Sequence, residues 1–164
     1  MGAKTILIVE DEIGPRESLR MILGAHYQVE SAENGLMAVE ILKRQSIDGV
    51  TLDLRMPGPS GIEVLKQIKK KWPSIQVLVI TGYATLRTAL DAIRYGAFHY
   101  LQKPFDIDEL VDTMHRMIRK KEQMDHVDSL TNRQNLQNGE ESLPSPKSDS
   151  KAPVLAFSDF ENMD

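Results

Sequence analysis

The sequence predicts an α/β fold in which helices cover both faces of a parallel sheet. Short apolar runs rich in Val, Ile, Leu and Thr recur along the first 102 residues, and this composition is typical of strands buried on both faces. Segments with helical spacing of apolar residues separate these runs. Several of these runs end on polar or charged residues. The alternation favours βα units joined by right-handed crossovers.

Five runs are predicted as strands, and their ranges are 6–9, 27–31, 49–53, 76–81 and 98–102. A helix is expected after each strand, and Pro73 and Gly96 are expected to end the third and fourth helices. The fourth helix is expected from about Thr85 to Tyr95. Four apolar residues recur there at helical spacing and predict a buried stripe, namely Leu86, Ala89, Leu90 and Ile93.

The chain is predicted to divide into one domain, residues 1–123, and a C-terminal part, residues 124–164. Met124, Val127 and Leu130 extend the apolar stripe of the last helix, so a helical extension is expected first. From 139 to 153 the sequence has the composition of a linker or a disordered, flexible tail. Residues 154–164 are again rich in acidic and apolar residues, and we leave open either a short docking motif or an unstructured terminus.

Composition excludes several classes of function. The 164 residues carry a formal charge of −4 and a pI near 5.6, so direct nucleic-acid binding is not expected. The chain has no Cys, which excludes disulfides and a cysteine nucleophile. The N-terminal apolar run is too short for a signal peptide or a membrane span. We therefore expect a cytoplasmic protein without a membrane partner.

Polar residues at the ends of four predicted strands, or just after them, form the candidate site. Glu10 and Asp11 follow the first strand, Asp53 ends the third, Thr81 ends the fourth and Lys103 follows the fifth. In a flavodoxin-like, doubly wound sheet with strand order 2-1-3-4-5, the first and third strands are neighbours at the switch point where ligands bind. We therefore expect the carboxylates to converge there, with the hydroxyl and the ammonium beside them.

This set of groups suits phosphoryl transfer. Clustered carboxylates and a backbone carbonyl provide the oxygen ligands that Mg²⁺ prefers. With the metal reducing charge repulsion, the Asp53 carboxylate can act as a nucleophile and become an aspartyl phosphate. Lys103 and Thr81 are then expected to contact the phosphoryl oxygens.

Residues 4–123 resemble the receiver domain of bacterial two-component response regulators, the fold of the chemotaxis regulators. Four motifs that occur in order carry this resemblance: 9–12 (Val-Glu-Asp-Glu), Asp53 with Met56-Pro57 and Gly61, 81–84 (Thr-Gly-Tyr-Ala), and 103–105 (Lys-Pro-Phe). The pattern departs from the family at Glu10, where the family often has Asp.

The resemblance implies a role for each matching residue. Asp53 is the expected phosphoacceptor, and Lys103 and Thr81 are the expected partners of the phosphoryl group. Mg²⁺ is expected on Glu10, Asp11, Asp53 and the backbone carbonyl of Arg55, with Asp11 favoured as a direct ligand. Thr81 and Tyr100 are the expected switch residues. The Lys103-Pro104 peptide bond is expected to be cis.

The resemblance also implies partners. A sensor histidine kinase or a phosphotransfer protein is expected to donate the phosphoryl group. The face of the fourth helix, fifth strand and fifth helix is expected to bind an unknown output protein. A homodimer is left open, with no face assigned to it. The chain is therefore expected to be a signalling phosphoprotein that catalyses its own phosphotransfer and dephosphorylation, and not an enzyme in the usual sense.

Several alternatives remain at this stage. A degenerate receiver would serve only as a docking platform, and the chain could be the N-terminal fragment of a longer transcriptional regulator. A phosphatase of the dehalogenase type would need an Asp at position 55, which is Arg. A flavin-binding module would need a Ser- and Thr-rich loop in place of the carboxylates after the first strand. The four histidines lack metal-ligand spacing and are expected at the surface or at helix ends: His26, His99, His115 and His126.

Overall fold

The computed structural model describes residues 2–137, in which five parallel strands form one sheet in the order β2-β1-β3-β4-β5. The strands are β1 (Thr5–Val9), β2 (Gln28–Ala32), β3 (Gly49–Leu52), β4 (Gln76–Thr81) and β5 (His99–Gln102). The helices are α1 (Ile13–Leu23), α2 (Gly35–Arg44), α3 (Gly61–Lys71), α4 (Leu86–Arg94) and α5 (Ile107–Gln137). The predicted flavodoxin-like fold and strand order are thus confirmed.

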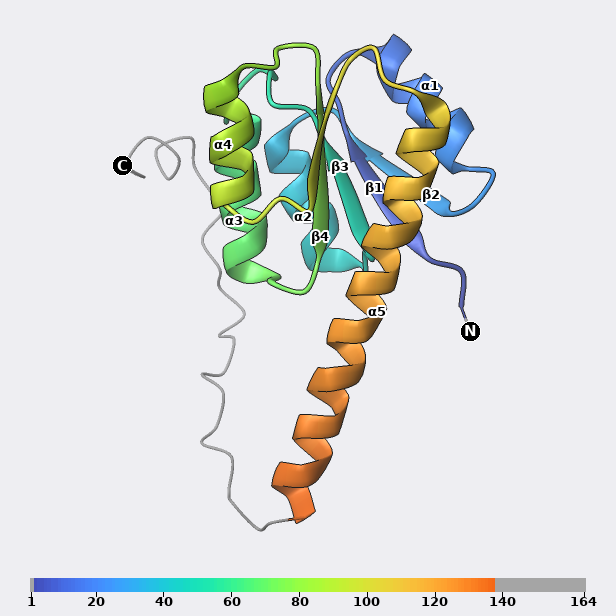
Figure 1. Cartoon of the computed structure of the whole chain (residues 1–164), viewed down its shortest axis with the longest axis vertical. Coiled ribbons are helices and arrows are strands. Elements are labelled where there is room, and N and C mark those ends of the chain that lie inside the picture. Colours follow the sequence, from blue (N-terminus) through green and yellow to red (C-terminus); the bar gives the residue numbers. More distant parts are fainter. Residues whose placement is uncertain (1, 138–164) are drawn as a thin grey trace.

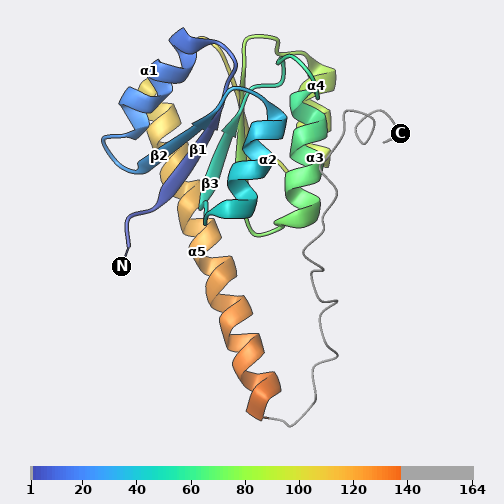
Figure 2. The same cartoon turned by 180° about the vertical axis from the view of Figure 1, so that it is seen from behind.

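The helices cover both faces of the sheet, with α1 and α5 on one face and α2, α3 and α4 on the other (Figures 1 and 2). Alternate residues of β1 reach the two layers, because successive side chains of a strand point to opposite faces. Ile6 and Ile8 belong to the cluster with α1 and α5. Leu7 and Val9 belong to the cluster with α2 and α3. Two apolar layers therefore hold the central strands and fix where each strand ends.

The orientation of α4 differs from the sequence expectation. Its predicted buried stripe faces outward, since Leu86, Leu90 and Ile93 are 78%, 58% and 65% exposed. Ala92 is instead the fully buried residue of this helix. Helical spacing identifies an apolar face, but it does not say whether that face meets the core. The small Ala92 side chain packs inward, and the large apolar side chains remain on the surface.

The last helix is longer than the apolar pattern indicated. α5 continues without a break to Gln137, and it passes position 123, where we placed the domain boundary. That boundary stays a prediction. The expected linker or tail and the docking motif at 154–164 lie outside the described residues.

Within residues 2–137, no helix is apolar enough over its length to cross a bilayer.

Gly61 brings the start of α3 against the end of β3. A Cβ at this position would collide with the Asp53 carbonyl oxygen and the Leu54 Cα, which are backbone atoms that cannot turn aside. The Gly61 N–H also donates to the Leu54 carbonyl, at 2.9 Å. Gly61 therefore permits the close approach that positions the residue after β3.

We predict that Gly61→Ala lowers the free energy of unfolding by about 1–3 kcal/mol, because the added methyl group must displace backbone. Gly14→Ala in α1 is the matched control. No atom lies within 4 Å of a Cβ built there, so this change should be neutral or stabilise by about 0.5–1 kcal/mol. Urea unfolding of both variants measures the difference. Equal stabilities would contradict the proposed backbone collision.

Candidate functional site

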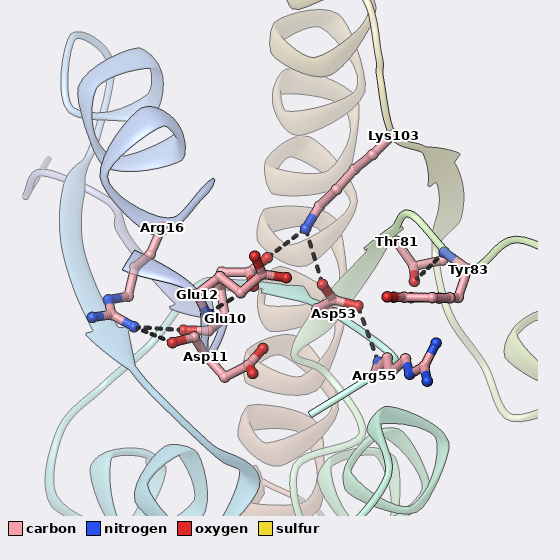
Figure 3. A network of polar contacts seen from close by, with 9 residues as sticks. All are labelled: Glu10, Asp11, Glu12, Arg16, Asp53, Arg55, Thr81, Tyr83 and Lys103. Atoms are coloured by element: carbon pink, nitrogen blue, oxygen red, sulfur yellow. Dashed lines mark hydrogen bonds and ion pairs between the residues drawn. The ribbon is translucent and has the colours of Figure 1, made fainter. Parts of the chain in front are cut away.

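The candidate site lies where four strands end at one edge of the sheet. Backbone hydrogen bonds continue past the strands, from Asp53 N–H to the Val9 carbonyl at 3.0 Å and from Lys103 N–H to the Thr81 carbonyl at 2.9 Å. The residues after β3 and β5 are therefore held in register with the neighbouring strands. The predicted residues Glu10, Asp53, Thr81 and Lys103 all lie at this edge (Figure 3).

Lys103 connects the two most buried carboxylates. Its Nζ donates to Glu10 Oε2 at 2.5 Å and to Asp53 Oδ2 at 2.9 Å. Glu10 is 1% exposed and Asp53 is 6% exposed, so both charges are largely removed from water. The Lys103-Pro104 peptide bond is cis, as the resemblance implied.

These contacts shift the three pKa values in different directions. Burial alone would raise the pKa of Asp53, but the Arg55 N–H and the Lys103 ammonium outweigh burial and lower this pKa. At Glu10 burial prevails and raises the pKa despite the contact with Lys103. Burial would lower the pKa of Lys103, but its two carboxylate partners raise it. Asp53 is therefore favoured as an anion next to a cation.

The loop after β1 carries a group of acidic side chains. Glu10, Asp11 and Glu12 each offer a carboxylate oxygen, and these atoms lie within 4.8 Å of one another. The Glu12 N–H donates to Glu10 Oε1, at 3.1 Å. Asp11 Oδ1 is buried and has no hydrogen-bond partner within the described residues. An oxygen-rich, negatively charged group with an unpaired buried acceptor fits a hard divalent cation such as Mg²⁺.

The switch residues predicted from the sequence make separate contacts. Thr81 is fully buried, and its Oγ1 accepts a hydrogen bond from the Tyr83 N–H at 3.2 Å. The Tyr100 hydroxyl pairs with Thr88 Oγ1 at 2.9 Å, and so it connects β5 to the first turn of α4. No hydrogen bond between Thr81 and Tyr100 is found within the described part of the chain.

Arg55 and Tyr83 form one wall of a hollow beside the site. The Arg55 guanidinium carbon lies 3.9 Å from the centre of the Tyr83 ring, which is the geometry of a cation–π contact. The hollow has a volume of about 310 Å³ and is lined by Asp11, Glu12, Arg55, Met56, Pro57 and Tyr83. The Arg55 N–H also donates to Asp53 Oδ1, at 3.0 Å. The backbone N–H of Arg55 thus contacts the candidate nucleophile, and its side chain packs on the Tyr83 ring to form the wall.

Sequence reasoning missed Arg16 of α1. This arginine is 8% exposed and donates to the backbone carbonyls of Glu10 and Asp11. A signal was present, because Arg16 shares the buried face of α1 with Leu19 and Leu23 at spacings of three and seven residues. A charged residue on a buried helical face needs polar partners, and here the partners are in the acidic loop.

Comparisons with known proteins agree with this geometry. Residues 6–115 match the family model described as the response regulator receiver domain. The chain is 44% identical over 110 residues to the transcriptional regulatory protein ZraR of Klebsiella oxytoca, covering 66% of this chain and 25% of that protein. It is 38% identical over 119 residues to sporulation initiation phosphotransferase F of Bacillus subtilis, covering 72% of this chain and 96% of that protein.

Solved structures give the same result. The response regulator TrrA of Thermotoga maritima in complex with Mg²⁺–BeF has a TM-score of 0.64 and 36% identity, covering 70% of this chain and 98% of that one. NtrX of Brucella abortus has a TM-score of 0.73 and 30% identity, covering 79% of this chain and 30% of that one. The chain thus spans about a quarter of the length of ZraR and nearly the whole of the Bacillus protein. From the matched residues and the shared fold together, this chain belongs to the response regulator receiver domain family.

Proposed function

We propose that the chain is a phosphoacceptor that takes a phosphoryl group on Asp53. The observation that carries this proposal is the convergence of Asp53, Glu10, Asp11, Thr81 and Lys103 at one sheet edge. The lowered pKa of Asp53 keeps this carboxylate ionised at neutral pH, as a nucleophile must be.

The proposed donor is a phosphohistidine on a sensor kinase or phosphotransfer protein. An Asp53 carboxylate oxygen forms a bond to phosphorus while the bond between phosphorus and the imidazole nitrogen breaks. The histidine leaves with the electron pair of that bond, and an acyl phosphate remains on Asp53. Hydrolysis of this acyl phosphate would return the chain to its starting state.

The residues beside Asp53 have distinct roles in this proposal. Lys103 already contacts Asp53 and is placed to pair with a phosphoryl oxygen. The Thr81 hydroxyl oxygen accepts from the Tyr83 N–H, so its own hydrogen is placed to be donated to another phosphoryl oxygen. Arg55 and Tyr83 form the wall beside the acceptor, so they are placed to limit the entry of the water that hydrolyses the acyl phosphate.

Mg²⁺ is the proposed cofactor. Glu10, Asp11, Asp53 and the Arg55 carbonyl would hold it, and the unpaired Asp11 Oδ1 supports this assignment. Glu12, which the sequence reasoning left out of the ligand set, belongs to the same acidic group. When bound, the metal would reduce the repulsion between these carboxylates and the incoming phosphoryl oxygens.

The proposed output is a change on the face formed by α4, β5 and α5. When Thr81 moves toward the phosphoryl group, the space beside it becomes free for Tyr100, which would then leave Thr88. Loss of this bond would release the first turn of α4. The exposed side chains of Leu86, Leu90 and Ile93 give this helix an apolar surface for an output protein. A two-state change of this kind needs roughly 5.5 kcal/mol to go from 1:99 to 99:1.

Asp53 is expected to accept the phosphoryl group only in the presence of the metal. The full chain incubated with Mg²⁺ and acetyl phosphate should gain the mass of one phosphoryl group. Asp53→Asn and addition of a chelator should each abolish the gain, because one removes the nucleophile and the other removes the metal. Intact-mass spectrometry measures the result.

Asp106→Asn is the matched control for loss of an acidic side chain, because Asp106 caps α5 and does not contact the site residues. It should be phosphorylated like the wild type. Failure of the wild type to gain mass, both from acetyl phosphate and from histidine kinases, would favour the docking platform. Equal gain in wild type and Asp53→Asn would place the acceptor elsewhere.

The Tyr100 hydroxyl is expected to hold the first turn of α4 against β5. Tyr100→Phe removes one hydrogen bond worth about 0.5–1.5 kcal/mol, so amide exchange over residues 86–94 should become roughly 2- to 12-fold faster in the unphosphorylated chain. Tyr95→Phe at the other end of α4 is the control, since its hydroxyl makes no hydrogen bond to the described residues. Hydrogen exchange that is unchanged in Tyr100→Phe would show that the hydroxyl does not hold α4.

A further inference from the structure

Arg16 is a buried charged residue that the proposed phosphotransfer does not use. Its Nη1 donates to the Glu10 carbonyl at 2.9 Å and to the Asp11 carbonyl at 3.1 Å. Its Nη2 donates to Glu33 Oε1, in the loop between β2 and α2, at 3.1 Å. One guanidinium thus joins α1 to the loops that follow β1 and β2.

Both carbonyls belong to residues whose carboxylates form the acidic group. Figure 3 shows Arg16 on the side of the loop away from Lys103 and Asp53, whereas the Glu10 carboxylate extends toward Lys103. Because the orientation of a peptide fixes the direction in which its side chain leaves, the two hydrogen bonds restrain where the Glu10 and Asp11 side chains point. Arg16 therefore acts on the carboxylates without touching them.

The loop needs such a restraint because its carboxylates repel one another. Lys103 pairs with Glu10, but within residues 2–137 neither Asp11 nor Glu12 has an ion-pair partner. The Arg16 charge lies directly behind the loop and partly offsets this repulsion. Its ion pair with Glu33 contributes little, since the Glu33 side chain is 65% exposed. The carbonyl contacts are thus the main role of the buried guanidinium.

We propose that Arg16 is a positioning residue that holds Glu10 and Asp11 in the geometry that binds Mg²⁺. This inference rests on the Mg²⁺ role in the proposed function. Groups that orient metal ligands typically change metal affinity by about 10- to 100-fold when they are removed. The planar fork of arginine reaches both carbonyls and Glu33 together, which a lysine ammonium does less well.

The test compares two arginines of the same helix. Arg20 lies one turn after Arg16 and also connects α1 to β2, with Nη2 donating to Ser31 Oγ at 2.5 Å and Nη1 to the Val29 carbonyl at 3.4 Å. Arg20 does not contact the acidic loop in the described structure. Arg20→Met therefore controls for the loss of a helix-to-strand contact.

The measurement is Mg²⁺ affinity, from the shifts of the amide resonances of residues 10–12 in the full chain titrated with MgCl₂. We expect Arg16→Met to raise the Kd by about 10- to 100-fold, and Arg16→Lys to raise it by less. Arg20→Met and Glu33→Gln should each stay within about twofold of the wild type, because the carbonyl contacts of Arg16 remain.

The outcomes separate this inference from the function on which it rests. If the wild type binds Mg²⁺ and Arg16→Met binds it equally well, the positioning role is overturned and the proposed function stands. An equal loss in Arg16→Met and Arg20→Met would also overturn it, since a general effect on α1 would explain both. If Arg16→Met does not fold, the Mg²⁺ Kd of Arg16→Lys is the deciding measurement. A Kd equal to that of the wild type would overturn the positioning role. If the wild type does not bind Mg²⁺, the metal role and this inference both fail.

Discussion

The contact of Lys103 with Glu10 and Asp53 is the interaction on which the site depends. It joins the loops after β5, β1 and β3, which are separated by 93 and 50 residues in the chain. Two buried carboxylates beside each other would each favour protonation. The Arg55 N–H and the Lys103 ammonium together lower the pKa of Asp53 and keep it ionised, whereas burial prevails and raises the pKa at Glu10. The asymmetry between the two acids thus arises from the groups around each one.

The ends of the central strands β1, β3 and β4 could be predicted because these strands are buried and largely apolar, and turn residues identified the ends of the outer two. Four polar positions after those runs identified Asp53, Glu10, Thr81 and Lys103, and parallel topology requires such positions to meet at one edge. Their chemical roles remain proposals, because proximity at the sheet edge does not itself establish what each group does. The sequence pattern thus predicted where these side chains lie, whereas their roles in phosphoryl transfer depend on experiments.

The α4 surface and Arg16 could not be predicted with the same rules, for one shared reason. Periodicity identifies which residues share a face, but burial of that face depends on what packs against it. In α4 the apolar face is exposed, and Ala92 provides the contact with the core. In α1 the buried face includes the charged Arg16, because the carbonyl groups of Glu10 and Asp11 in the loop just before the helix satisfy it. Both features depend on what packs against the helix, which the spacing of residues along the helix does not specify.

The length of α5 has a mechanical consequence. Met124 of this helix accepts a hydrogen bond from the Gln76 side-chain amide of β4 at 3.2 Å, and Glu122 forms an ion pair with Lys4. Beyond Met124 the helix continues to Gln137, a distance of about 20 Å at 1.5 Å per residue. A tilt of α5 by about 10° at the domain would therefore displace its far end by about 3 Å. A helix of this length would convert a small rotation beside the sheet into a larger movement at its far end.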